Sequence, residues 1–146
     1  KVLILGAGGV APSIISALNK MGCSEIILSN RTKEKADNLK KIYQDLKIVN
    51  WGEQPDFDMI INATSLGLNE KDEIKINYSN LGPKKFFYDI IYNPKKTNFL
   101  TQAKKFSNQI ENGKCMFAYQ AQIAFEIWHK IKPKIDEKVL ELIEND

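Results

Sequence analysis

The residue types with the clearest chemical use lie near the start of the chain, where a glycine-rich run covers residues 6–11 with the sequence GAGGVA. The pattern Gly-x-Gly-x-x-Ala is typical of a turn that binds a dinucleotide pyrophosphate. Gly6 can make a tight turn, Gly8 lets the backbone approach a phosphate, and Ala11 is small enough for a helix to pack on a sheet. Free N–H groups at the start of that helix would face the phosphates.

The residues around this run decide between a nucleotide-binding turn and an ordinary strand-to-helix turn. Four apolar residues at 2–5 precede the run and predict a buried strand. An amphipathic stretch follows it and predicts a helix, with apolar side chains at Ile14, Ile15, Leu18 and Met21. Because a strand and a helix flank the glycines in this order, we interpret the run as a dinucleotide-binding turn.

A second group of candidate binding residues follows the strand predicted over residues 25–29. NAD-binding folds usually place an Asp or Glu at the end of this strand, where it hydrogen-bonds the ribose 2′-hydroxyl. This chain has Asn30, Arg31 and Thr32 there, with Lys35 close behind. Arg31 can bind a 2′-phosphate through its planar fork and stack on adenine, so NADP is predicted in preference to NAD. The alternative is a solvated Arg31 before a helix capped by Thr32 or Asn30, and the two roles are compatible.

A third polar run, INATSLG over residues 61–67, ends the fourth predicted strand. In a doubly wound fold, ligands lie beyond the carboxyl ends of the strands, where loops of this kind meet the cofactor. An ordinary polar turn has the same composition. The run is therefore a candidate for contact with the cofactor.

These candidate residues require a fold that brings the ends of several strands together. Alternating strand and helix patterns predict an α/β fold, a doubly wound parallel sheet of the Rossmann type with about six strands in the order 3-2-1-4-5-6. The predicted strands cover residues 1–5, 25–29, 46–50, 58–63, 86–91 and 109–112. The predicted helices cover residues 9–21, 33–44 and 97–106, with a short turn or helix near residues 77–81.

Beyond Gly113 the pattern changes to two C-terminal helices, over about residues 113–146. The first has the sequence MFAYQAQIAFEIWHKI and is apolar around much of its circumference, and a second amphipathic helix follows Pro133. A helix of the first kind needs partners on more than one side. Either it faces a domain that this chain lacks, or it is buried against the final helix.

Length and charge limit the classes of protein to which the chain can belong. Its 146 residues suit one well-buried domain. Lys1 enters a strand at once without an initiator Met, so we expect a piece of a longer protein that begins at a domain boundary. The 21 basic and 18 acidic residues give a net charge of +3 that is spread along the chain, which predicts no nucleic-acid partner.

The remaining reactive and aromatic residues give few functional signals. Cys23 and Cys115 lie far apart and His129 is the single histidine, so we expect neither a disulfide framework nor a metal site. No apolar run approaches the roughly 20 residues that span a bilayer, which predicts no membrane partner. A reducing cytoplasm is the expected location. We interpret Trp51 and Trp128 as packing residues rather than cofactor contacts.

Five motifs in one order resemble the C-terminal NADP-binding domain of the shikimate dehydrogenase family. They are GAGGVA at residues 6–11, NRT at 30–32, INATSLG at 61–67, YDIIYNP at 88–94 with Thr97, and NGKCM at 112–116 followed by Gln120. The resemblance extends from Lys1 to about Trp128. The chain departs from the family at Lys114 and Cys115, where smaller or apolar residues are common.

The resemblance implies a role for each matching residue. On the adenosine side it implies a pyrophosphate cradle formed by Gly6, Ala7, Gly8, Gly9 and Val10. Around the 2′-phosphate and adenosine it implies Asn30, Arg31, Thr32 and Lys35. On the nicotinamide side it implies a lining of Thr64, Ser65, Ile90, Gly113 and Met116. It further implies that Tyr92 and Gln120 reach across to the cyclohexene acid.

By the same resemblance, the whole protein would be an NADP-dependent oxidoreductase of aromatic amino-acid biosynthesis that reduces 3-dehydroshikimate to shikimate. The family's catalytic Lys and Asp belong to an N-terminal substrate domain outside residues 1–146, so we expect no catalytic residue here and an inactive chain on its own. Shikimate or 3-dehydroshikimate would bind between the two domains of a monomer or homodimer. Two alternatives stay open: a quinate/shikimate dehydrogenase with broader cofactor use, and a non-catalytic dinucleotide-sensing module.

Overall fold

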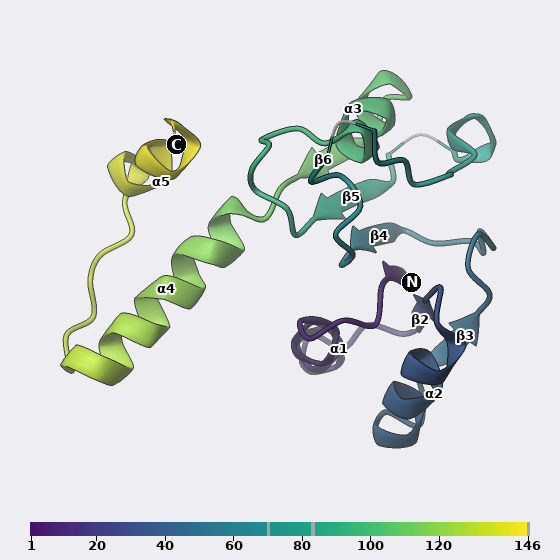
Figure 1. Cartoon of the computed structure of the whole chain (residues 1–146), viewed down its shortest axis with the longest axis horizontal. Helices are drawn as coiled ribbons and strands as arrows, with labels where there is room; N and C mark the ends of the chain where they lie inside the picture. Colours follow the sequence, from purple (N-terminus) through teal and green to yellow (C-terminus); the bar gives the residue numbers. More distant parts are fainter. Residues whose placement is uncertain (70, 83, 146) are drawn as a thin grey trace.

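The computed structural model describes residues 1–69, 71–82 and 84–145, which form a parallel sheet with helices on both faces (Figure 1). Its strand order is β3-β2-β1-β4-β5-β6. The strands are β1 (Val2–Leu5), β2 (Ile26–Ser29), β3 (Lys47–Val49), β4 (Met59–Asn62), β5 (Phe86–Asp89) and β6 (Gln109–Glu111). Neighbouring strands all pair in parallel. The predicted Rossmann-type sheet and its strand order are confirmed.

The connections between strands place helices on both faces of the sheet. The helical elements in these connections are α1 (Ala11–Lys20), α2 (Lys33–Ile42), the 3₁₀ turn η1 (Tyr78–Asn80) and α3 (Asn98–Lys105). The helices α1 and α2 pack on one face and α3 packs on the other. Each face has its own apolar core, as a doubly wound fold requires.

Strand β1 shows how one short sequence serves both cores. Successive side chains of a strand point to opposite faces of the sheet. Val2 and Ile4 join the core under α1 and α2, whereas Leu3 and Leu5 join the core under α3. All four residues are buried. This explains why the strand is continuously apolar rather than alternating.

Two C-terminal helices follow the sheet, as predicted: α4 (Lys114–His129) and α5 (Glu137–Asn145). The first begins and ends two residues earlier than the predicted range of 116–131. The Asn112 side chain accepts a hydrogen bond from the Lys114 backbone N–H at 3.1 Å, which favours the early start. Lys130 adopts a left-handed φ of 57°, which ends the helix. We call residues 1–113 the sheet body and residues 114–145 the C-terminal arm.

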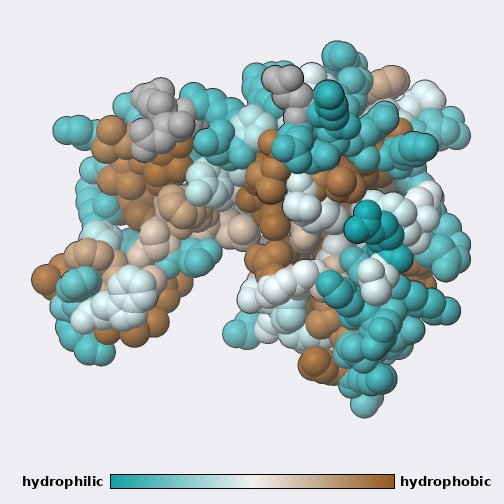
Figure 2. All heavy atoms as spheres, in the orientation of Figure 1, coloured by the Kyte–Doolittle hydropathy of each residue, from teal (hydrophilic) through white to brown (hydrophobic). Residues whose placement is uncertain are grey.

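The arm projects away from the sheet body (Figure 1), and apolar side chains are exposed on it (Figure 2). Ala118 alone is buried among the residues of α4, all of which the structure describes. The large apolar residues exposed along the arm are Phe117, Tyr119, Ile123, Phe125, Ile127, Trp128, Ile131 and Leu142. The two arm helices pack against each other. That contact leaves much of the apolar surface of α4 uncovered.

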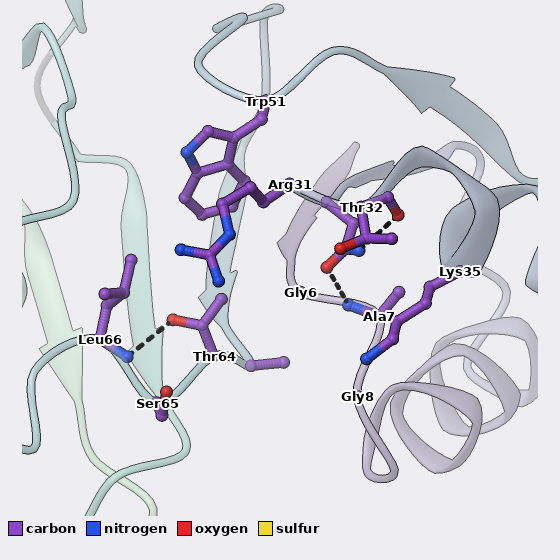
Figure 3. Close-up of a pocket in the computed structure, with 12 residues that line it drawn as sticks. Gly6, Ala7, Gly8, Arg31, Thr32, Lys35, Trp51, Thr64, Ser65 and Leu66 are labelled. Atoms are coloured by element: carbon purple, nitrogen blue, oxygen red, sulfur yellow. Dashed lines mark hydrogen bonds between the residues drawn. The ribbon is translucent and has the colours of Figure 1, made fainter.

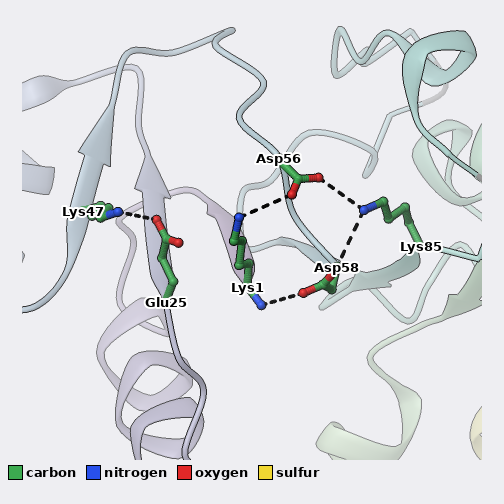
Figure 4. Close-up of polar contacts among 6 residues, drawn as sticks. All are labelled: Lys1, Glu25, Lys47, Asp56, Asp58 and Lys85. Atoms are coloured by element: carbon green, nitrogen blue, oxygen red, sulfur yellow. Dashed lines mark hydrogen bonds and ion pairs between the residues drawn. The ribbon is translucent and has the colours of Figure 1, made fainter.

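The edge of the sheet where the strands begin is charged. Lys85 lies 3.3 Å from Asp56 and 3.9 Å from Asp58, and Lys47 lies 2.5 Å from Glu25 (Figure 4). The hydrogen bond from Lys85 lowers the pKa of Asp56, and the hydrogen bond from Lys47 lowers the pKa of Glu25. Exposed ion pairs of this kind contribute little to stability. The opposite edge, where the strands end, contains the candidate binding residues.

Candidate functional site

A pocket of about 290 Å³ lies where β1, β2 and β4 end (Figure 3). Its walls come from the loops that follow these strands and from the loop after β3. The lining residues are Gly6, Ala7, Gly8, Asn30, Arg31, Thr32, Lys35, Trp51, Ala63, Thr64, Ser65 and Leu66. Nine of the predicted site residues are therefore brought together in one hollow, which is the location expected for a ligand in this fold.

Gly6 is the residue that the glycine turn most strictly requires. Its φ is +105°, and a Cβ there would lie 2.7 Å from the Ala63 carbonyl oxygen. The Gly6 N–H donates to the Ser29 carbonyl at 2.8 Å, and the Ala7 N–H donates to Asn30 Oδ1 at 2.9 Å. A Cβ at Gly8 would instead meet its nearest atom at 3.9 Å. The turn is therefore fixed against β2 and β4, while Gly8 leaves space on the pocket side.

The cationic part of the pocket lies at the end of β2. Arg31 and Lys35 are exposed pocket residues, and no Asp or Glu lines this pocket. Asn30 Nδ2 donates to the Thr32 carbonyl at 2.7 Å, which together with its bond from Ala7 fixes the loop. Thr32 is the N-cap residue of α2, as one of the two predicted alternatives had it, but its side chain makes no capping hydrogen bond. Two positive charges in a pocket lining that holds no carboxylate favour an anionic ligand group.

The two tryptophans are not the packing residues that we predicted. Trp51 lines the pocket and is 37% exposed. Trp128 lies on α4 and is 75% exposed. The prediction failed because a sequence shows that a residue is aromatic but not which of its faces the fold covers.

A buried polar cluster behind the pocket joins the two loops that follow β4 and β5. Asp89 accepts hydrogen bonds from Asn62 Nδ2 at 3.0 Å and from Thr97 Oγ1 at 2.7 Å. It also accepts one from the Ile91 N–H at 3.1 Å. Asn62 in turn accepts from the Thr64 N–H at 3.0 Å. Burial raises the pKa of Asp89, and these hydrogen bonds act in the opposite direction.

Sequence reasoning assigned no role to Asn62, Asp89 or Thr97, although all three lie inside the motifs that it used. The signal that could have found Asn62 and Asp89 is a polar residue at the end of an apolar strand, which must find partners if it is buried. Asp89 also corrects the predicted end of β5. The strand ends there rather than at Ile91, because the Ile91 N–H bonds to the Asp89 side chain instead of extending the ladder.

Of the predicted nicotinamide residues, Thr64 and Ser65 line this pocket, whereas the others and the predicted substrate residues lie outside its lining, around the junction of the sheet body with the arm. A Cβ on Gly113 would lie 1.9 Å from the Ile90 carbonyl oxygen, so this close approach requires glycine. The Tyr92 ring stacks on Phe117 with centroids 4.6 Å apart. Met116 and Gln120 follow on α4, one turn apart, and Gln120 is exposed. Gly9 and Val10 also lie outside the pocket lining, at the start of α1.

Other kinds of site find no support among the described residues. Within residues 1–69, 71–82 and 84–145, no three His, Cys, Asp or Glu side chains are grouped so that they could hold a metal ion. Cys23 and Cys115 are both free. None of the helices in these ranges combines the length and apolar character that a membrane crossing requires.

Comparisons with known proteins agree with this geometry. Residues 1–97 match the family model of shikimate / quinate 5-dehydrogenase. The chain is 58% identical over 144 residues to the shikimate dehydrogenase (NADP(+)) of Pelagibacter ubique, covering 99% of this chain and 54% of that protein. The chain thus spans about half the length of the curated relatives that it matches.

Two solved structures share the fold over nearly the whole chain. The shikimate dehydrogenase of Aquifex aeolicus superposes with a TM-score of 0.83 at 34% identity, covering 99% of this chain and 53% of that one. A shikimate dehydrogenase in complex with NADP+ superposes with a TM-score of 0.84 at 34% identity, covering 99% and 52%. With the family model matched over residues 1–97, the chain belongs to the shikimate / quinate 5-dehydrogenase family.

Proposed function

We propose that this chain is the NADP-binding half of a shikimate dehydrogenase, which reduces 3-dehydroshikimate to shikimate with NADPH. The observation that carries the proposal is the pocket beyond β1, β2 and β4, which combines a glycine turn with Arg31 and Lys35 and has no carboxylate in its lining. A relative named for NADP(+) and a neighbour structure that contains NADP+ support the choice of cofactor.

In this proposal the adenosine half of NADP occupies the pocket. Residues 6–10 cradle the pyrophosphate, with backbone N–H groups near the start of α1 directed toward it. Asn30, Arg31, Thr32 and Lys35 surround the 2′-phosphate. Arg31 binds this group through a charge-assisted fork, whereas the ribose hydroxyl of NAD would offer no anion in its place. The residues present therefore fit NADP better than NAD.

The nicotinamide half would lie between the loops that follow β4 and β5. Thr64 and Ser65 would line it from one loop, and Ile90 from the other, with Gly113 and Met116 at the start of α4. The cofactor supplies the hydride when it is bound. The chain's own contribution is orientation, because the Asp89 cluster fixes both loops before any ligand arrives.

Tyr92 and Gln120 would form this chain's part of the substrate site. Both side chains are exposed near the start of α4, and both are neutral groups that hydrogen-bond hydroxyls or a carboxylate. The stack of Tyr92 on Phe117 orients the tyrosine ring. The Tyr92 hydroxyl would then make the hydrogen bond to the substrate. The substrate would be shared with an N-terminal domain that carries the Lys and Asp of the family's proton chemistry.

The same proposal accounts for the exposed apolar surface of the arm. A separate substrate domain would lie against α4 and cover side chains such as Ile123 and Ile127, which are 56% and 61% exposed. Residues 1–146 alone are then expected to bind NADP but not to turn over shikimate, because no group in the chain matches the family's catalytic pair. A shikimate-dependent NADPH assay on this chain and on the full-length protein tests the point.

Calorimetric titration of the full-length protein with NADP+ and NAD+ tests the cofactor assignment. We expect a preference for NADP+ of roughly tenfold to a hundredfold, the size of one charge-assisted contact. Arg31→Ala should abolish most of this preference, whereas Lys104→Ala, an exposed cation on α3, should leave it unchanged. Equal affinities in the wild type, or a preference that survives Arg31→Ala, would contradict the assignment.

Steady-state kinetics with shikimate and with quinate separate the proposed enzyme from the broader quinate/shikimate enzyme. We expect a higher kcat/KM for shikimate. A full-length protein that binds NADP+ but oxidises neither acid would support the non-catalytic sensing module instead.

A further inference from the structure

Trp51 is an aromatic residue of the pocket to which the proposed function gives no role. It lines the pocket with the glycine turn and Arg31, and it also lines a neighbouring hollow of about 350 Å³ with Leu66 and Ile74. Trp51 thus borders two cavities. A large aromatic side chain left 37% exposed in this position has an uncovered apolar surface.

The local backbone holds Trp51 in place. The Glu53 N–H donates to the Asn50 carbonyl at 3.1 Å and closes a four-residue turn. Gly52 has a φ of 91°, which the third position of a type II turn requires. The Asn50 side chain also bonds to Glu53, and Ser29 Oγ donates to the Asn50 carbonyl at 3.0 Å. The turn is therefore tied to the end of β2, and Trp51 lies at its tip.

The order of the strands gives the indole a specific neighbour in the ligand. The glycine turn follows β1, Arg31 follows β2 and Trp51 follows β3, and these three strands are adjacent in the sheet. Adjacent strands lie about 5 Å apart. A nucleotide with its pyrophosphate at β1 and its ribose 2′-phosphate at β2 extends its base toward β3. Figure 3 shows the Trp51 indole and the Arg31 guanidinium turned toward the same part of the pocket.

We propose that Trp51 is the stacking platform for the adenine base of NADP and determines affinity on the adenosine side of the pocket. The indole offers a planar aromatic face to a planar aromatic base, and the rigid turn reduces the entropy lost when the base is bound. The proposal rests on the proposed function, because it takes NADP as the ligand. It makes Trp51 a binding residue and gives it no part in hydride or proton transfer.

The test is calorimetric titration of the full-length protein with adenosine 2′,5′-bisphosphate, which carries the adenine and the 2′-phosphate but no nicotinamide. Trp51→Ala should weaken binding by roughly tenfold to a hundredfold, the usual effect of losing one base-stacking contact. Trp51→Phe should recover most of this loss because it keeps an aromatic face. Trp128→Ala is the matched control and should bind as the wild type does, because Trp128 lies on the arm.

Tryptophan fluorescence provides a second readout that does not depend on a stable Trp51→Ala variant. Quenching by the bisphosphate should be lost in Trp51→Phe and kept in Trp128→Phe. Wild-type affinity in Trp51→Ala, or equal losses in the alanine and phenylalanine variants, would overturn the stacking role while leaving NADP binding intact. A wild-type protein that binds neither the bisphosphate nor NADP+ would overturn the proposed function and this inference together.

Discussion

The strands β1 and β2 of the sheet body and the helix α4 of the C-terminal arm are all rich in apolar residues but bury them very differently. In the sheet body, β1 and β2 are buried at every position. In the arm, Ala118 is the one buried residue of α4, while Ile127 is 61% and Trp128 75% exposed. Apolar composition therefore does not by itself specify burial within one chain. The sheet body carries its own partners for each apolar face, whereas α4 presents an apolar face that its own chain does not cover.

The largest expected effect comes from truncating matched apolar residues in the two regions. Leu28→Ala, at a fully buried position of β2, should lower the free energy of unfolding by about 2–5 kcal/mol. Ile127→Ala, at an exposed position of α4, should change it by less than about 0.5 kcal/mol in residues 1–146. Urea denaturation followed by circular dichroism measures both values.

The same pair of variants in the full-length protein sharpens the comparison. If a substrate domain covers α4, Ile127→Ala should cost more there than in residues 1–146, while the cost of Leu28→Ala stays the same. Equal small costs for Ile127→Ala in both proteins would show that this part of the arm stays uncovered.

The second prediction concerns the junction of the two regions. Gly113→Ala would place a methyl group 1.9 Å from the Ile90 carbonyl oxygen, so the backbone must shift. We expect a loss of about 3 kcal/mol in the free energy of unfolding, at the upper end of the usual cost of overpacking. Gly82→Ala is the control, because a Cβ there meets nothing within 4 Å. If the two variants had equal stabilities, the close approach at Gly113 would not exist in solution.

The third prediction tests whether residues from both regions share one substrate. Tyr92→Phe in the sheet body and Gln120→Ala in the arm should each lower kcat/KM for shikimate in the full-length protein, by an amount equivalent to roughly 1–3 kcal/mol. The Kd for NADP+ should stay nearly unchanged, since neither residue lines the adenosine pocket. If the loss appeared in cofactor binding alone, or if both variants kept wild-type kcat/KM, these residues would not form the substrate wall.

The smallest expected effect is a difference in pH dependence between two aspartates of the sheet body. Burial raises the pKa of Asp89 above its ordinary value of 3.8, so its contribution to stability is present at low pH and is lost as pH rises through the raised pKa. Hydrogen bonds from Lys85 and Lys1 lower the pKa of the exposed Asp56, so its contribution is present above 3.8 and is lost as pH falls.

Chemical denaturation between about pH 3 and pH 7, the range in which carboxyl groups titrate, measures how the free energy of unfolding changes with pH. Relative to the wild type, Asp89→Asn should gain stability as pH rises, and Asp56→Asn should gain stability as pH falls. Added salt should reduce the effect of Asp56→Asn more, because that carboxylate is exposed. If the stabilities of the two variants, relative to the wild type, changed in the same direction with pH, the opposite pKa shifts of Asp89 and Asp56 would be contradicted.

The sequence predicted the fold because local and tertiary preferences agree along the sheet body. Residues 2–5 are apolar, the glycine turn follows at once, and the amphipathic stretch after it forms α1. The pattern of each segment therefore agrees with its place in the fold. The order of the strands followed from the order that is typical of a doubly wound sheet. The predicted short turn or helix near residues 77–81 is the 3₁₀ turn η1.

What the sequence could not predict depends on contacts between distant segments. The role of Asp89 depends on Asn62 and Thr97, which come from a neighbouring strand and a following loop. The exposure of Trp51 depends on a turn held by Ser29, and stacking of Tyr92 on Phe117 depends on where α4 leaves the sheet. The residue type at any one of these positions is compatible with packing, capping or binding.

The amide of Asn62 has a consequence for the substitutions that this family member can tolerate. Its nitrogen donates to the Leu66 carbonyl at 2.9 Å and to Asp89 at 3.0 Å, and its oxygen accepts from Thr64 at both the backbone N–H and the hydroxyl. Asp would lose both donors, Leu would lose every bond, and Gln would displace the same amide by one methylene. In a saturation mutagenesis experiment, position 62 should therefore accept only asparagine, although Asn62 does not itself line the pocket.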